Sequence, residues 1–111
     1  MKEISGGALI TKILIQNGIN KAFCVPGESY LGVLEAIRES KNKFDLVVCR
    51  HEGGAAYMAE AYGRLTQMPG ICFVTRGPGA CNASIGVHTA YHEGTPLILS
   101  LIHISEPTRP S

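Results

Sequence analysis

The chain alternates between short apolar runs and longer segments in which apolar residues recur at helical spacing. The apolar runs cover residues 22–25, 46–49, 71–75 and 97–102, lengths that suit buried strands. Each of the first three runs is followed by a glycine-containing turn and then by a helical segment. This repeated order of strand, turn and helix predicts an α/β fold in which a parallel sheet has helices on both faces.

The first helical segment covers residues 6–17, with Ser5 as its N-cap and Gly18 as its stop. A second segment is marked by the spacing of Leu31, Leu34 and Ile37. The predicted apolar stripe of the first helix consists of Leu9, Ile10, Ile13 and Leu14.

The third helical segment begins just after Glu52 and is rich in small residues. These residues allow close helix packing, either against a partner subunit or against the sheet of the same chain, and the sequence favours neither. The predicted apolar face of this helix consists of Ala55, Met58, Ala59, Tyr62 and Leu65.

The turns V-P-G, R-H-E-G-G and R-G-P-G-A each follow a predicted strand. Right-handed crossovers between parallel strands bring all three turns to one edge of the sheet, where open α/β sheets bind ligands. Glu52 lies in the middle turn, at the start of a helix. Taken alone, Glu52 is better explained as a residue that caps and solubilises the turn. Its position among the three converging turns makes it a candidate functional carboxylate.

Composition excludes several classes of function. A net charge of +1 gives no electrostatic basis for binding nucleic acid or an anionic membrane, and the chain has no Trp for base stacking. No apolar run reaches the roughly 20 residues that a membrane span needs. We therefore expect a cytoplasmic protein with neither a nucleic-acid partner nor a membrane partner.

Metal and phosphate sites are also disfavoured. No two of the four cysteines have C-x-x-C spacing, and we expect them to be reduced packing residues rather than metal ligands. Gly77-Pro78-Gly79 lacks the spacing of a P-loop or a dinucleotide-binding turn, so it indicates a phosphate site only weakly. His51 and His88 are candidates for acid–base chemistry, but we expect His88 to be packed on the same helix face as Ile85.

Four motifs occur in order along the chain: V-P-G, R-H-E-x-x-A-x-x-M-A-E-x-Y-x-R, G-P-G-x-x-N-x-x-x-G and G-T-P. Together they resemble the N-terminal pyrimidine-binding domain of thiamine-diphosphate enzymes, and most closely the acetolactate synthase-like group. This group includes 2-oxoacid decarboxylases and pyruvate oxidases. The resemblance runs from about Gly6 to Ile98 and implies a six-stranded parallel sheet, of which this chain would hold an incomplete part.

The resemblance assigns roles residue by residue. Glu52 matches the family's catalytic glutamate, which hydrogen-bonds N1′ of the cofactor's aminopyrimidine and so promotes proton removal from the thiazolium C2. Pro26 and Gly27 match the turn that lines the pyrimidine. Pro78 and Asn82 match positions near its other edge. Asn82 lies in the first turn of its helix, where capping is the alternative role.

The resemblance also implies what lies outside this chain. In the family, a second domain with a G-D-G…N motif holds the diphosphate and Mg²⁺, usually on the partner subunit of a homodimer or tetramer. No G-D-G occurs here, so the chain would supply half of a cofactor site and be inactive alone. The substrate implied is a 2-oxoacid, and FAD is compatible with the group. Two alternatives stay open: a doubly wound module that binds a nucleotide or flavin, and a fragment that binds nothing.

The C-terminal residues depart from the family pattern. The string from Leu99 to Arg109, L-S-L-I-H-I-S-E-P-T-R, resembles the translation of a transposase-type sequencing-library adapter. We therefore expect a truncated domain over residues 1–98 and a non-native tail over 99–111. An apolar edge strand formed at this junction would be a site of aggregation.

Overall fold

The computed structural model describes residues 6–26, 31–39, 43–75 and 77–101. The described residues form eight elements in alternating order. They are α1 (Gly6–Gln16), β1 (Lys21–Cys24), α2 (Leu31–Glu39), β2 (Asp45–Val48), α3 (Glu52–Thr66), β3 (Gly70–Phe73), α4 (Pro78–Glu93) and β4 (Leu97–Ser100). The predicted sequence of strands and helices is confirmed. Ser5, the predicted cap of α1, lies outside the described residues.

The four strands form one parallel sheet in the order β2-β1-β3-β4. Phe23 of β1 lies at the centre, paired with Val47 of β2 on one side and with Cys72 of β3 on the other. The chain goes from β1 outward to β2 and then returns past β1 to β3. The direction of winding therefore reverses between β1 and β3, which is where open α/β sheets form their ligand crevice.

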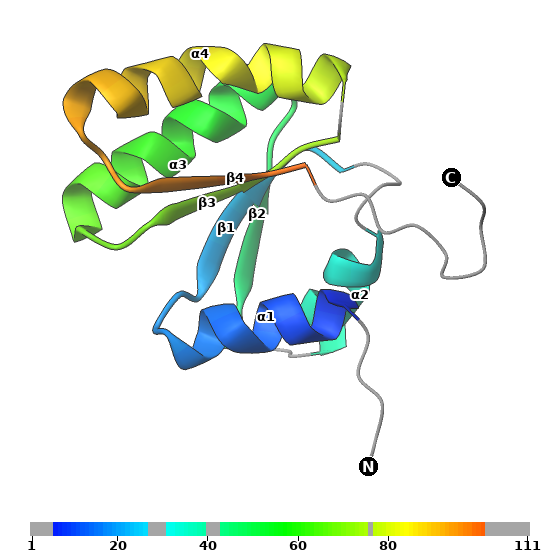
Figure 1. Ribbon diagram of the computed structural model, residues 1–111. Coiled ribbons are helices and arrows are strands. Elements are labelled where there is room, and N and C mark those ends of the chain that lie inside the picture. The colour runs from blue at the N-terminus through cyan, green and yellow to red at the C-terminus, as the bar shows by residue number, and fades with distance from the viewer. Residues whose placement is uncertain (1–5, 27–30, 40–42, 76, 102–111) are drawn as a thin grey trace.

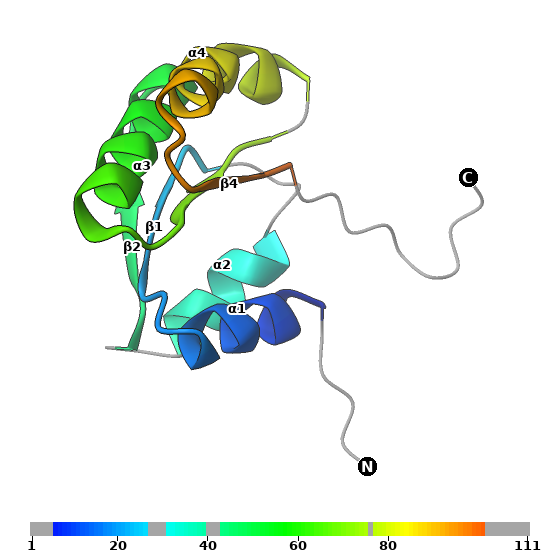
Figure 2. The same ribbon diagram turned by 60° about the vertical axis from the view of Figure 1, so that its left-hand side comes forward.

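Helices cover both faces of the sheet, as the sequence predicts. In Figure 1, α3 and α4 lie side by side above the strands, and α1 and α2 lie below them. The rotated view of Figure 2 keeps the same two layers. The core on the α1/α2 face consists of Ile19, Ala22, Cys24, Ile37, Phe44, Ile71 and Phe73. The core on the α3/α4 face consists of Phe23, Ala55, Ala56, Ala59, Cys72, Val74 and Ala83.

The predicted apolar faces of two helices are partly wrong. In α3, Ala55 and Ala59 are buried, but Met58 is 46% and Leu65 is 84% exposed. The buried surface of α3 is instead formed by small residues and one carboxylate: Gly53, Ala55, Ala56, Ala59, Glu60 and Gly63. In α1, Ile10 and Leu14 pack on the core, whereas Leu9 and Ile13 are exposed.

The small residues of α3 pack within the chain. A Cβ placed on Gly86 of α4 would lie 2.4 Å from the Cβ of Ala56 and 3.0 Å from the backbone nitrogen of Tyr57. A Cβ on Gly63 would lie 2.4 Å from the backbone oxygen of Pro96. α3 therefore approaches α4 and the start of β4 more closely than any side chain at these glycines would allow.

A buried carboxylate joins α3 to the turn before β4. Glu60 Oε2 accepts hydrogen bonds from Thr95 Oγ1 at 2.8 Å, from Arg64 Nε at 3.0 Å and from an Arg64 terminal nitrogen at 2.7 Å. These donors, Thr95 first and then Arg64, hold the pKa of Glu60 below its ordinary value. Arg64 also lies 3.5 Å from Glu93 of α4. The network fixes the C-terminal half of α3 at the end of the sheet opposite the strand-end turns.

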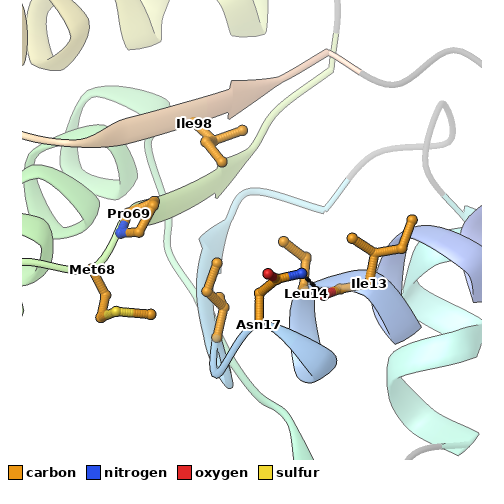
Figure 3. A pocket seen from close by; sticks show the side chains of 7 residues that line it. Ile13, Leu14, Asn17, Met68, Pro69 and Ile98 are labelled. Atoms are coloured by element: carbon orange, nitrogen blue, oxygen red, sulfur yellow. Dashed lines mark hydrogen bonds between the residues drawn. The ribbon is translucent and has the colours of Figure 1, made fainter.

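An apolar hollow of about 390 Å³ lies on the α1 side of the sheet, and Figure 3 shows the side chains that line it. Its lining comes from the segments that precede β1 and β3, from α1 and from Ile98 of β4. Asn17 is the polar side chain in this lining, and its Nδ2 already donates to the backbone oxygen of Ile13 at 2.7 Å. The hollow therefore offers little polar recognition. It also lies near the N-terminal ends of the strands, away from Glu52.

Candidate functional site

The carboxyl ends of β1, β2 and β3 are held together by hydrogen bonds that continue the ladder into the turns. Cys49 N donates to Cys24 O at 2.7 Å, and Val25 N donates to Phe73 O at 3.3 Å. The segments that follow these strands therefore start from one edge of the sheet. This edge includes the reversal point between β1 and β3.

Glu52 enters this edge as the first residue of α3. The N-cap of α3 is His51, which has extended backbone angles (φ −140°, ψ 142°), and its Nδ1 accepts a hydrogen bond from Gly53 N at 2.9 Å. His51 thus takes the capping role that the sequence suggested for Glu52. Glu52 is half-buried as a residue, and its carboxylate lies at the helix N-terminus, where the dipole favours negative charge.

The Glu52 carboxylate contacts the next helix as well as its own. Asn82 Nδ2 in α4 donates to Glu52 Oε1 at 3.1 Å. A Cβ built on Gly79 would lie 3.6 Å from Glu52 Oε2 and 2.9 Å from the methyl group of Thr75. Glu52 therefore lies close to the first turn of α4, and no larger residue than glycine fits at position 79 without a shift.

The other predicted site residues follow the same strand ends. Pro26 is exposed directly after β1, and Gly27 lies outside the described residues. Pro78 is the first residue of α4, behind Gly77, whose φ is +73°. The structure thus joins Glu52 to Asn82 by a hydrogen bond. It places Pro26 in the segment that follows β1, and Pro78 at the start of the helix that follows β3.

Three of the four cysteines pack against the protein as expected, but Cys81 is exposed on α4, which corrects the expectation for that residue. Cys24 and Cys72 are buried in their strands, Cys49 is half-buried after β2, and none of the four cysteines forms a disulfide. Burial raises the pKa of the Cys72 thiol to about 12. Within residues 6–26, 31–39, 43–75 and 77–101, no group of three or more His, Cys, Asp or Glu side chains could hold a metal ion.

His88 is exposed on α4, which corrects the expectation that it packs against the protein. Its ring stacks edge-on against His92 one helical turn later, with centroids 4.4 Å apart. Ile85 lies on the same face, as predicted, but that face is also exposed. His88 therefore lies outside the Glu52 site.

Two features of the site were missed from the sequence. His51 is an uncommon N-cap residue, so residue preference gave no signal for it. A side chain at position 79 is excluded because Thr75 and Glu52 lie close to where its Cβ would be. In the sequence, this restriction is indicated only by the two glycines that flank Pro78. Among the described helices, none is long and apolar enough to cross a bilayer.

Comparison with known proteins identifies relatives over most of the chain. Residues 4–108 match the family described as thiamine pyrophosphate enzyme, N-terminal TPP binding domain. The chain is 40% identical over 93 residues to an acetolactate synthase of Bacillus subtilis (strain 168), covering 84% of the chain and 16% of the relative. It is 36% identical over 99 residues to the acetolactate synthase isozyme 3 large subunit of Escherichia coli (strain K12), covering 89% and 17%.

A mitochondrial acetolactate synthase catalytic subunit of Saccharomyces cerevisiae (strain ATCC 204508 / S288c) is 35% identical over 96 residues, covering 86% of the chain and 14% of the relative. The chain therefore spans about a sixth of the length of the curated relatives it matches.

Proposed function

Because the chain belongs to the N-terminal TPP-binding domain family of thiamine pyrophosphate enzymes, we propose that it forms the pyrimidine half of a thiamine-diphosphate site with Glu52 as the catalytic residue. One observation carries this proposal. Glu52 is a half-buried residue at the strand-end edge, and its Oε1 accepts a solvent-exposed hydrogen bond from Asn82. No described residue donates a hydrogen bond to Oε2.

The residues present fit the aminopyrimidine of thiamine diphosphate. A carboxylate oxygen that accepts no hydrogen bond from a described residue suits a ring N–H. Gly79 keeps the backbone of the first turn of α4 close to this oxygen, because a Cβ there would lie only 2.9 Å from the methyl group of Thr75. Pro26 and Pro78 would line the ring from the turns after β1 and β3. Glu52 would hold the proton shared with N1′ at Oε2. When bound, the cofactor supplies a nucleophilic carbon and a sink for the electrons released at a carbonyl carbon.

The activity of the whole protein is a further part of the proposal. We infer that the complete protein is an acetolactate synthase-like enzyme, a transferase or lyase acting on 2-oxoacids, since the relatives described above are named acetolactate synthases. The diphosphate and Mg²⁺ would bind to a separate domain on the partner subunit of a homo-oligomer, and FAD is compatible with such an enzyme. The cytoplasm is the proposed compartment.

The alternative, a nucleotide- or flavin-binding module without thiamine chemistry, is not favoured. The matched family is defined by thiamine pyrophosphate binding. The glycines near Pro78 also lack the spacing of a dinucleotide-binding turn, because the next helix glycine, Gly86, comes too late.

The test is a Glu52→Gln substitution in the complete protein that carries this sequence. Glutamine keeps the shape but cannot share a proton in the same way. We expect thiamine-diphosphate-dependent turnover of pyruvate to fall by about 100-fold or more. Glu35→Gln is the matched control, because Glu35 is exposed on α2, where it pairs with Arg38. Full turnover in the Glu52→Gln protein would overturn the proposal.

A further inference from the structure

Asn82 is the residue whose observed contact departs from its predicted role. Sequence resemblance places it near the cofactor, and its position in the first turns of α4 suggested capping. The N-cap of α4 is Gly77, which makes no side-chain capping bond. The Asn82 side chain instead reaches across thirty residues of sequence to donate its Nδ2 proton to Glu52 Oε1 at 3.1 Å.

This hydrogen bond determines the orientation of the carboxylate. The last torsion of a glutamate side chain joins an sp³ to an sp² carbon, so its rotation is broad unless a partner fixes it. Asn82 supplies that partner from a different helix. With Oε1 engaged, Oε2 is the carboxylate oxygen to which no described residue donates a hydrogen bond, and it lies 3.6 Å from where a Cβ on Gly79 would be.

The part of α4 that carries Asn82 is tightly packed. Gly86, one turn further along α4, packs directly on the backbone of Ala56 and Tyr57 in α3. Ala83, adjacent to Asn82, is fully buried in the core between the helices and the sheet. The distance between Asn82 and Glu52 is therefore fixed by backbone packing, as a positioning contact requires.

We propose that Asn82 is a positioning residue that acts through Glu52: it occupies Oε1 and so assigns Oε2 to the ring N1′ of the cofactor. This inference rests on the proposed function of Glu52. It differs from a direct contact between Asn82 and the pyrimidine, because the effect of Asn82 depends on its ability to donate a hydrogen bond to a carboxylate.

The first test needs no cofactor. In NMR spectra of the ¹⁵N-labelled chain, the side-chain amide resonances of Asn82 should shift strongly in the Glu52→Gln variant. The same resonances should be unchanged in Glu35→Gln, which alters an exposed carboxylate on α2. The proposal would be overturned if the chemical shifts of the Asn82 side-chain amide were the same in the Glu52→Gln variant as in the parent.

The second test compares two substitutions of Asn82 in the complete protein, with thiamine diphosphate as the probe. Asn82→Ala removes the donor, and we expect cofactor affinity to fall about tenfold. Asn82→Asp keeps the shape but places a second carboxylate against Glu52, so we expect a larger loss than for alanine. A merely structural role predicts the reverse order, because aspartate preserves the packing better.

Ser84→Ala is the matched control, since Ser84 is exposed on α4 and donates its hydroxyl proton to Cys81 O in its own helix. If Glu52→Gln abolishes turnover while both Asn82 variants bind the cofactor like the parent, the positioning role is wrong and the proposed function stands. If Glu52→Gln itself is fully active, the proposed function fails, and the positioning role fails with it.

Discussion

Adding one methyl group at Gly86 should push α4 away from α3 and lower the free energy of unfolding. The ideal Cβ of an alanine at this position would lie 2.4 Å from the Cβ of Ala56, 2.8 Å from the carbonyl carbon of Ala56 and 3.0 Å from Tyr57 N. Two of these three atoms belong to the backbone of α3, so rotating a side chain cannot relieve the contact. The helices must move apart.

The expected size follows from two opposing effects. Overpacking a tight interface costs about 1–3 kcal/mol, and a backbone contact places Gly86→Ala near the upper end of that range. Alanine in place of glycine inside a helix contributes about 1 kcal/mol in the other direction. The free energy of unfolding should therefore fall by about 2 kcal/mol. With a urea slope of about 1 kcal/mol per M, the unfolding midpoint should fall by about 2 M.

The assay is urea unfolding of the chain, followed by far-ultraviolet circular dichroism. Gly54→Ala is the matched control, because Gly54 lies in α3 and a Cβ there meets nothing within 4 Å. That variant should gain about 0.5–1 kcal/mol from helix propensity alone. The packing argument is refuted if Gly86→Ala unfolds at the same urea concentration as the parent, or at a higher one.

Three further predictions concern other parts of the structure. Glu60→Gln should lower the free energy of unfolding at pH 7 by about 1–2 kcal/mol, because a charged hydrogen-bond acceptor is lost. The pKa of Glu60 is lower in the folded than in the unfolded protein. The stability that the Glu60 carboxylate contributes is therefore present above pH 4.5 and is lost as the pH falls through the folded-state pKa. The urea midpoints of the parent and Glu60→Gln proteins should therefore approach each other as the pH is lowered from 7 to 3. A difference between the midpoints that stays constant with pH would contradict this. Ile98→Lys should reduce aggregation measured by light scattering, since Ile98 is 46% exposed on edge strand β4. Unchanged scattering would show that this edge strand is not the surface through which the protein aggregates. In native protein at pH 8, iodoacetamide should label exposed Cys81 and spare Cys72, whose pKa is about 12; mass spectrometry showing early Cys72 labelling would disprove this.

The sequence predicted the layers of the fold because its strands are short apolar runs separated by glycine turns. It failed on the buried face of α3 because hydrophobic spacing selects large apolar side chains. The helix instead buries glycine and alanine against α4, which leaves Met58 and Leu65 exposed. The buried carboxylate of Glu60 accepts a hydrogen bond from Thr95, thirty-five residues further along the chain. The local sequence pattern around Glu60 gives no indication of a partner so distant in the sequence.

The candidate site was only partly predictable for a related reason. Topology brings the strand ends together, so the convergence of the turns around Glu52 could be expected from the alternation alone. The hydrogen bond between Glu52 and Asn82 depends on the distance between α3 and α4, which the contact of Gly86 with Ala56 sets. Glycine in a sequence indicates conformational freedom or close approach without saying which atom is approached.

The central claim is tested most directly by a crystal structure of the complete protein with thiamine diphosphate bound, through the distance from Glu52 to N1′ of the aminopyrimidine. We predict that Oε2 lies about 2.7–3.0 Å from N1′ while Oε1 keeps its bond from Asn82. A carboxylate turned away from the ring, or a ring that contacts Oε1 in place of Asn82, would contradict the account.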